Sequence, residues 1–294
     1  MTSPATPRVA GKRGKLPAQF PAALRDLTYY AAGPLPAAPA SVAVPNVADW
    51  GVLGNDTEGD CGPCGYIHGC MAAAAETSET EAFPTATDVV NAYLAYTGGQ
   101  DSGVVLSQFL AYVKANGFCG HTVAAYAPVA VQDIPTLQFT VNAYDFAYCG
   151  ITVTQEMEAE FSAGQPWDLA AAKGSPLGGH CVPVVGYDSD YLTVITWGQP
   201  QKVAYSAWQV IADEAWAVLT GEVATAGTDG HGINLAALQA DLSKLDSPQP
   251  AAGPGHKSIL GELGAFIHEL AADAEEGAAE AYAKILGWLE SRNI

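Results

Sequence analysis

Apolar residues recur every three to four positions in three early segments, which predicts three consecutive helices. These segments are 62–79 (GPCGYIHGCMAAAAETSE), 85–98 (TATDVVNAYLAYTG) and 104–117 (VVLSQFLAYVKANG). Thr87 or Asp88 is expected to cap the second helix, because short polar side chains accept hydrogen bonds from the first free backbone N–H groups. The third helix is expected to end before Gly117, since glycine adopts the left-handed conformation that terminates helices.

The period changes to that of short strands after residue 120. Strand character is expected over 121–129, 137–148, 180–188, 191–198 and 201–208, with a short helix at 154–164 and either a helix or a buried strand at 209–220. Helices followed by antiparallel strands are typical of an α+β fold.

Composition divides the chain into four parts. Residues 1–48 are rich in Ala and Pro and predict an extended arm with a short helix near 22–31. The patterned core covers 49–220, and a connector with a Pro/Gly linker covers 221–257. Residues 258–294 show 3–4 spacing of apolar residues, which predicts a long amphipathic helix.

Charge is strongly negative and unevenly distributed. The 294 residues contain 12 Lys and Arg against 31 Asp and Glu, a formal net charge of −19. Nucleic-acid binding by the core is therefore not expected, because phosphate contacts need clustered basic residues. Five of the twelve basic residues (Arg8, Lys12, Arg13, Lys15 and Arg25) lie in the arm. A basic arm and an acidic core predict that the arm lies on its own core or on a neighbour.

The first residues carry charges but no apolar stretch of the kind found in signal peptides, and no run of 18 apolar residues occurs. We therefore expect a cytoplasmic protein without a membrane contact. In that compartment the six cysteines are expected to be thiols rather than a disulfide framework.

The stretch NDTEGDCGPC, residues 55–64, contains two closely spaced cysteines. A zinc site would need a second pair of ligands, and no second Cys-x-x-Cys occurs in the chain. A thioredoxin-like pair would follow a strand, whereas the residues before Cys61 have the composition of a loop. Neither a metal nor an organic cofactor is expected.

A nucleophilic cysteine is the third interpretation. Cys61 opens the first predicted helix, where the helix dipole favours a thiolate. Asn55 stands six residues earlier, and its amide can donate to a developing oxyanion. His180 begins an apolar strand 119 residues later and is the candidate base.

Three segments resemble the papain-like cysteine peptidases, in the order that this superfamily shows. They are DWGVLGNDTEGDCGPCGYIHGC, GVVLSQFLAYVKANGFCGHTVAAYAPV and GGHCVPVVGYDSDYLTVITWG, and the resemblance covers about residues 46–220. The GNDxxGDC block also resembles papain-like proteins of actinobacteria and their phages.

The resemblance implies a fold with a helical half around a central nucleophile helix and a half made of antiparallel sheet. It implies acyl transfer on a peptide or isopeptide bond, with Cys61 as nucleophile and Asn55 as oxyanion donor. Cys64 is the alternative nucleophile, but Glu58 would then stand at the oxyanion position, and a carboxylate cannot donate a hydrogen bond there. His180 is the implied base.

The third catalytic position departs from the superfamily. Thr196 stands where an Asn or Asp is expected to orient His180, and Trp197 would shield that contact from water. A neutral hydroxyl cannot stabilise an imidazolium as a carboxylate would. The alternative is therefore a weak or inactive papain-fold module that is anchored by residues 1–48 and 258–294 in an assembly such as a phage virion. The expected partners are a peptide or protein substrate, if the chain is active, or the proteins of that assembly.

Overall fold

The computed structural model describes residues 8–77, 83–221 and 231–245. The chain divides into two compact units, Met1–Pro250 and Ala251–Ile294, and all described residues belong to the first. The amphipathic helix expected at 258–294 lies outside the described residues. In the part that is described, no helix has the length and apolarity needed to cross a bilayer.

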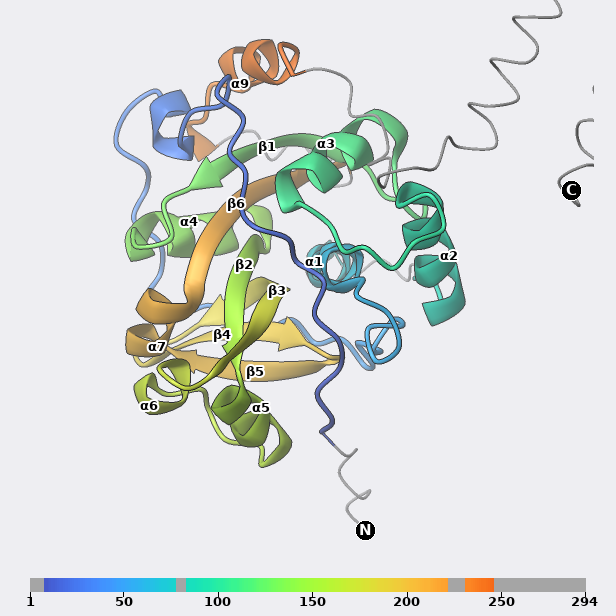
Figure 1. Ribbon diagram of the computed structural model, residues 1–294. Helices are drawn as coiled ribbons and strands as arrows, with labels where there is room; N and C mark the ends of the chain where they lie inside the picture. Colours follow the sequence, from blue (N-terminus) through green and yellow to red (C-terminus); the bar gives the residue numbers. More distant parts are fainter. Residues whose placement is uncertain (1–7, 78–82, 222–230, 246–294) are drawn as a thin grey trace, which may run out of the picture. The chain divides into compact units, whose positions relative to one another are not determined.

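The described residues contain one sheet of six antiparallel strands in the order β1-β6-β2-β3-β4-β5 (Figure 1). The strands are β1 Val123–Val129, β2 Ala147–Thr154, β3 Pro176–Tyr187, β4 Tyr191–Thr196, β5 Gln199–Ala204 and β6 Ala212–Thr220. β2 pairs with β3 along its whole length, with Ile151 opposite His180. This central pair carries the candidate base.

Three helices form the other half of the molecule: α1 Cys61–Thr77, α2 Ala86–Tyr96 and α3 Leu106–Asn116. α1 is apolar on all sides and packs against β3, with α2 on its far side and α3 next to β1 (Figure 1). A helix that is apolar all round is buried on all sides. This central position fixes the first turn of α1, and with it Cys61, against the sheet.

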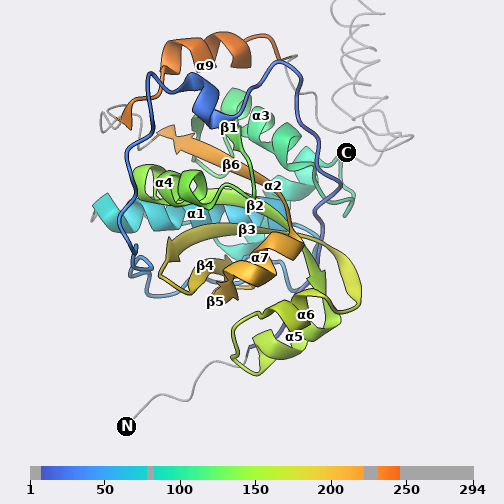
Figure 2. The ribbon, with the colours of Figure 1, turned by 90° about the vertical axis from the view of Figure 1, so that its left-hand side faces the viewer.

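Smaller helices cover the sheet and its ends, as Figure 2 shows from the side. They are η1 Leu27–Tyr30, α4 Ile134–Tyr144, α5 Gln155–Ser162, α6 Leu169–Ala172, α7 Tyr205–Ile211 and α9 Leu235–Leu242. The α+β class and the papain-like division into a helical half and a sheet half are both confirmed.

Three local predictions were wrong. Residues 137–144, expected as strand, belong to α4, because the Asp133 side chain and a proline start a helix there. The cap of α2 is Thr85, and Asp88 is the reciprocal partner of its capping box. Residues 205–208, expected as strand, begin α7.

The described part of the arm lies on its own core. Leu24, Leu27 and Tyr30 are buried, and Val42 pairs with Tyr187 of β3. Before this anchored region, residues 8–16 run between the sheet and the helical half, past the first turn of α1 (Figure 1).

Candidate active site

Cys61 is the first residue of α1, and its thiol is 1% exposed. The loop before it is packed tightly, with Leu53 and Gly54 both at positive φ. The first N–H groups of a helix have no partner within the helix. The structure therefore places the Cys61 thiol next to backbone donors at the positive end of the α1 dipole.

His180 lies on β3 and is 1% exposed. Its Nε2 is 2.9 Å from the Thr196 Oγ1, and the Trp197 ring stacks on the imidazole with 4.8 Å between ring centroids. Its Nδ1 has no hydrogen-bond partner among the described residues. Thr196 and Trp197 thus occupy the predicted positions around His180, and the free Nδ1 is the nitrogen that remains for a thiol.

Asn55 is buried close to Cys61, but its amide is already engaged. Its Nδ2 donates to the Glu58 carbonyl at 3.0 Å and to the Asp60 Oδ1 at 3.2 Å. An amide nitrogen has two hydrogens, so both are used. Asn55 therefore has no free amide hydrogen for an oxyanion in this arrangement.

The arm crosses the site as an extended strand. The Gly14 N–H donates to the Cys61 Sγ at 3.3 Å, and the Lys15 N–H donates to the Gly179 carbonyl, next to His180. On the helical wall the arm pairs in parallel with Val104, through the Gly14 carbonyl and the Leu16 N–H. Backbone hydrogen bonds therefore hold the arm to both walls of the cleft.

The N-terminal side of this segment is fixed as well. The Lys12 N–H donates to the Asn55 carbonyl at 2.6 Å, and the Lys12 carbonyl accepts from the Trp197 Nε1 at 3.4 Å. Arg8 lies over the Phe161 ring and donates to Gln201. The residues that follow Lys12 cover the candidate thiol and reach the strand of the candidate base.

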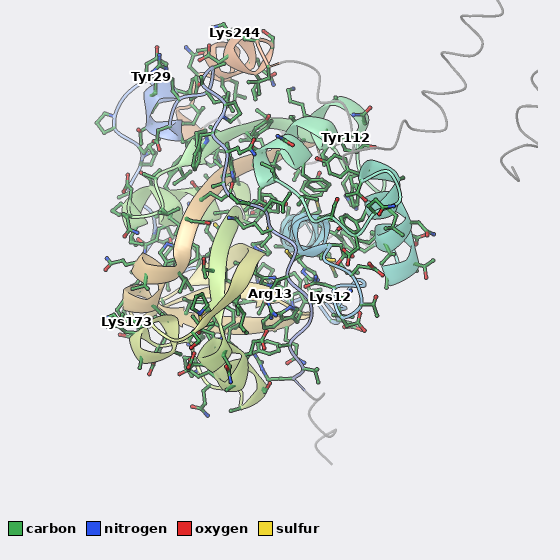
Figure 3. The ribbon with its side chains drawn as sticks, in the orientation of Figure 1. Lys12, Arg13, Tyr29, Tyr112, Lys173 and Lys244 are labelled. Atoms are coloured by element: carbon green, nitrogen blue, oxygen red, sulfur yellow. The ribbon has the colours of Figure 1, made fainter. Side chains whose placement is uncertain are left out.

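Ion pairs add to these contacts on both sides of the arm. Lys12 pairs with Asp101 on the helical side, and Arg13 pairs with Glu158 of α5 on the sheet side. Figure 3 shows the two basic residues on opposite sides of the arm. The predicted attraction between basic arm and acidic core is therefore satisfied within this chain.

Glycines let the arm approach the cleft closely. A Cβ on Gly14 would lie 1.6 Å from the Gly59 carbonyl oxygen, and a Cβ on Gly103 would lie 2.1 Å from the Gly14 carbonyl oxygen. Both obstacles are backbone atoms, which cannot rotate away as a side chain can. Only glycine fits at position 14 while the arm is in place.

Burial beneath the arm makes the candidate pair electrically neutral. Burial raises the pKa of Cys61 to about 11, although the Gly14 N–H opposes this shift. Burial lowers the pKa of His180 to about 3, with a further contribution from the positive charge of Arg13. The covered state thus contains a neutral thiol and a neutral imidazole, rather than an activated thiolate.

Cys64 has different surroundings. It lies in the first turn and a half of α1, and its buried Sγ donates to the Leu53 carbonyl. Burial raises its pKa well above the usual value, and the negative charge of Asp60 adds to that shift. No described contact joins Cys64 to the arm, whereas the Cys61 thiol accepts a hydrogen bond from the Gly14 N–H of the arm.

Asp60 is a residue of the site that the sequence did not single out. It is fully buried between Asn55 and Cys64, and burial raises its pKa to about 7. The carboxyl group holds the Asn55 amide in its present orientation. Its place directly before the candidate nucleophile was the available signal.

The arm contacts were also missed from the sequence. The run GKRGK, residues 11–15, alternates glycines with basic residues. Glycines at this spacing were a signal for a segment that passes close to another backbone. Lys15 enters a buried acidic pocket that no sequence pattern had indicated.

The alternatives for the cysteine pair can be compared with the geometry. Cys61 and Cys64 are not joined in a disulfide. Among the described residues, no three His, Cys, Asp or Glu side chains converge in a metal-binding group.

The order of the strands, the central helix that begins at a cysteine and the histidine on the facing strand define a papain-like fold. A search of solved structures bears this out. The chain matches xylellain, a cysteine protease from Xylella fastidiosa, with a TM-score of 0.55 and 14% sequence identity. The match covers 74% of this chain and 99% of xylellain. No family model matches the sequence, and no curated protein matches it either.

Proposed function

We propose that this chain is a thiol peptidase of the papain type that is held inactive by its own arm. The observation that carries the proposal is the meeting of three groups at one cleft. These are the thiol of Cys61 at a helix start, the free Nδ1 of His180, and an extended peptide that lies across both. A cleft that already holds one extended peptide by backbone hydrogen bonds has the shape needed for a peptide substrate.

The reaction follows from the chemistry of the two groups. With the cleft open, His180 takes the proton of Cys61, and the thiolate attacks the carbonyl carbon of a peptide or isopeptide bond. The C–N bond breaks as His180 gives that proton to the leaving amine, and a thioester remains. Water, deprotonated by His180, then hydrolyses the thioester and frees the thiol. Thr196 keeps the imidazole in the required orientation throughout.

The oxyanion needs a rearrangement before it can be stabilised. The Cys61 backbone N–H, at the start of α1, is the first donor. Asn55 becomes the second donor only if its amide exchanges one of its two present partners, Glu58 or Asp60. The site is therefore closed in two respects, by the arm and by the Asn55 hydrogen bonds.

The direction of the arm explains why the chain does not cut itself there. The leaving amine receives its proton from His180, so the residues that follow a scissile bond lie on the side of His180 and Trp197. In the arm, Lys12 lies against Trp197, whereas Leu16, later in the chain, donates its N–H to the Val104 carbonyl. The arm thus runs opposite to a cleavable substrate and presents an N–H group, not a carbonyl carbon, to Cys61.

The second candidate is a scaffold without activity. It is favoured by the neutral Thr196 beside His180 and by the engaged Asn55 amide. In that case the papain fold serves as a module that binds other proteins of an assembly through residues 1–48 and 258–294, as in a virion.

Alkylation by iodoacetamide across a pH series separates the two candidates, with site mapping by mass spectrometry. The experiment uses the full chain with Gly14→Val, which removes the arm from the cleft by a backbone clash, with and without His180→Ala. A peptidase requires that Cys61 reacts fast near about pH 6, well below the ordinary thiol pKa, and that His180→Ala abolishes this reactivity. Slow reaction of Cys61 in both variants would establish the scaffold, and fast reaction at Cys64 would move the nucleophile to that residue.

A further inference from the structure

Lys15 is a buried basic residue of the arm, and its side chain fills a pocket in the sheet wall of the cleft. The side chain is 1% exposed. Its Nζ is 2.7 Å from the Asp213 Oδ2 and 3.1 Å from the Glu214 Oε1. Asp213 is partly open to solvent, but Glu214 is fully buried. A pocket with a buried carboxylate at its base accepts a cation far better than a neutral group.

The pocket is shaped for this occupant. The Glu214 Oε2 accepts from the Trp216 Nε1 at 2.9 Å, which fixes the carboxylate. The Glu214 Oε1 has no described partner other than the Lys15 ammonium. A Cβ on Gly150 of β2 would lie 2.0 Å from the Lys15 Cε. Because residue 150 is a glycine, there is room for the Lys15 side chain to enter the pocket.

The electrostatic surroundings agree with this geometry. Burial by itself would lower the pKa of Lys15, but the carboxylates of Asp213 and Glu214 outweigh it and raise that pKa. Burial raises the pKa of Glu214, although Lys15 opposes the shift. Without a cation in the pocket, Glu214 would be a buried charge with no counterion.

The residue that enters the pocket directly follows the residue that contacts the candidate thiol. Gly14 contacts Cys61, and the next residue, Lys15, enters the pocket while its N–H donates to the Gly179 carbonyl. Lys15 also lies on the side of Gly14 away from Lys12 and Trp197. That side receives the residues before a scissile bond, so the pocket takes the second residue before the bond.

We propose that Glu214, Asp213 and Gly150 form a specificity pocket for a basic side chain, lysine foremost, at the second position before the scissile bond of the substrate. The inference rests on the proposed function and names its substrate class. The arm then uses Lys15 to occupy the site that a substrate lysine occupies after the arm has left. Substrates with a neutral residue at that position leave Glu214 unpaired and are discriminated against.

The test uses the full chain with Gly14→Val and Lys15→Met, which opens the cleft and removes the competing lysine. A library of peptides is digested, and the cleavage sites are read by mass spectrometry. We expect Lys and Arg to be enriched at least about tenfold at the second residue before the cut, and Glu214→Gln to abolish the enrichment. Gln keeps the acceptor for Trp216, and Asp213→Asn, which alters only the exposed carboxylate, is expected to weaken the preference less.

Cleavage without this enrichment, or enrichment that survives Glu214→Gln, would overturn the pocket while leaving the peptidase intact. If no peptide is cut, the peptidase proposal fails, and binding decides the pocket by itself. The same chain with Cys61→Ser is then titrated calorimetrically with short peptides that carry lysine or norleucine. Tighter binding of the lysine peptide by at least about tenfold, lost in Glu214→Gln, would support the pocket. Equal binding, or none, would refute it.

Discussion

The arm consists of two regions that are held by different forces. Residues 11–16 lie in the cleft through backbone hydrogen bonds and ion pairs, and Leu16 is 39% exposed. The region around Leu27 and Tyr30 is fixed by apolar burial instead, with both side chains almost fully enclosed. Leu24 is buried as well and marks the start of this anchored region.

This difference in the forces means that the cleft segment can open without unfolding of the anchored region. Exposed hydrogen bonds and ion pairs of the cleft segment exchange for water with a small change in free energy, and the buried pair of Lys15 with Glu214 is the contact that most opposes release. Withdrawal of large apolar side chains from the core costs more than loss of the exposed contacts. The cleft segment can therefore leave while the anchored region stays in the core. The cleft segment is thus a tethered inhibitory segment, joined to the folded core by the anchored region.

The largest expected effect is on the anchored region. Leu27→Ala removes a fully buried side chain and is expected to lower the free energy of unfolding by about 2–5 kcal/mol. Denaturant unfolding at neutral pH measures this loss. The alkylation rate of Cys61 in the folded protein should hardly change. A selective rise in that rate would show that the two regions are coupled.

Gly14→Val acts on the other region. The new side chain meets the Gly59 backbone, so the cleft segment must leave, and Cys61 alkylation should rise about 10- to 100-fold. Gly33→Ala is the matched control, because a Cβ on that arm glycine would meet nothing within 4 Å. Equal rates in the two variants would mean that the arm does not protect the thiol.

Acid should open the cleft segment without unfolding the chain. The covered His180 has its pKa lowered to about 3, so it binds fewer protons than an open histidine with an ordinary pKa of 6.5. The covered state therefore loses stability as the pH falls from 6.5 towards 3. Asp101 acts in the same direction, since its hydrogen bonds to Gly59, Tyr93 and Lys12 lower its pKa despite partial burial.

Hydrogen exchange measured by mass spectrometry, corrected for the intrinsic pH dependence, detects this opening. Protection of residues 11–16 should fall between about pH 7 and about pH 4, whereas protection of η1 should persist. Unchanged protection of the cleft segment over that range would argue against the linkage to His180.

The smallest effect is expected from the exposed ion pair. Lys12 and Asp101 have side chains that are 49% and 35% exposed, and such pairs contribute about 0–1 kcal/mol. Lys12→Ala should raise the alkylation rate by no more than about fivefold, and salt should reduce the difference from wild type. A change as large as that of Gly14→Val would mean that the Lys12 ion pair, rather than the backbone hydrogen bonds, keeps the cleft segment in place.

The sequence predicted much of the fold. Apolar spacing predicted helices over 62–79 and 104–117, which the structure has as α1 and α3. Residues 137–144 were missed, because Val141 and Phe139 fit a strand as well as a helix and only the Asp133 cap decides between them. Local propensity is ambiguous in short apolar runs of this kind.

The closure of the site could not be read from local patterns. The contact of Gly14 with Cys61 spans 47 residues, and that of Lys15 with Asp213 spans 198 residues. The pocket depends on a glycine, two carboxylates and a lysine that come from three separate segments. Charge asymmetry predicted that the arm lies on acidic surface, but only the folded chain shows which surface.

The short connection between Leu16 and the anchored Leu24 has a consequence for competition. A ligand that is tethered by so few residues faces its site at an effective concentration in the millimolar range. A free peptide with a lysine in the same register has to compete with that local concentration, so substrate alone displaces the cleft segment poorly. A single proteolytic cut between Leu16 and Leu24 would remove this advantage, because the cleft segment would then bind only at its bulk concentration. The length of chain between those two leucines thus sets the effective concentration at which the cleft segment competes with substrate.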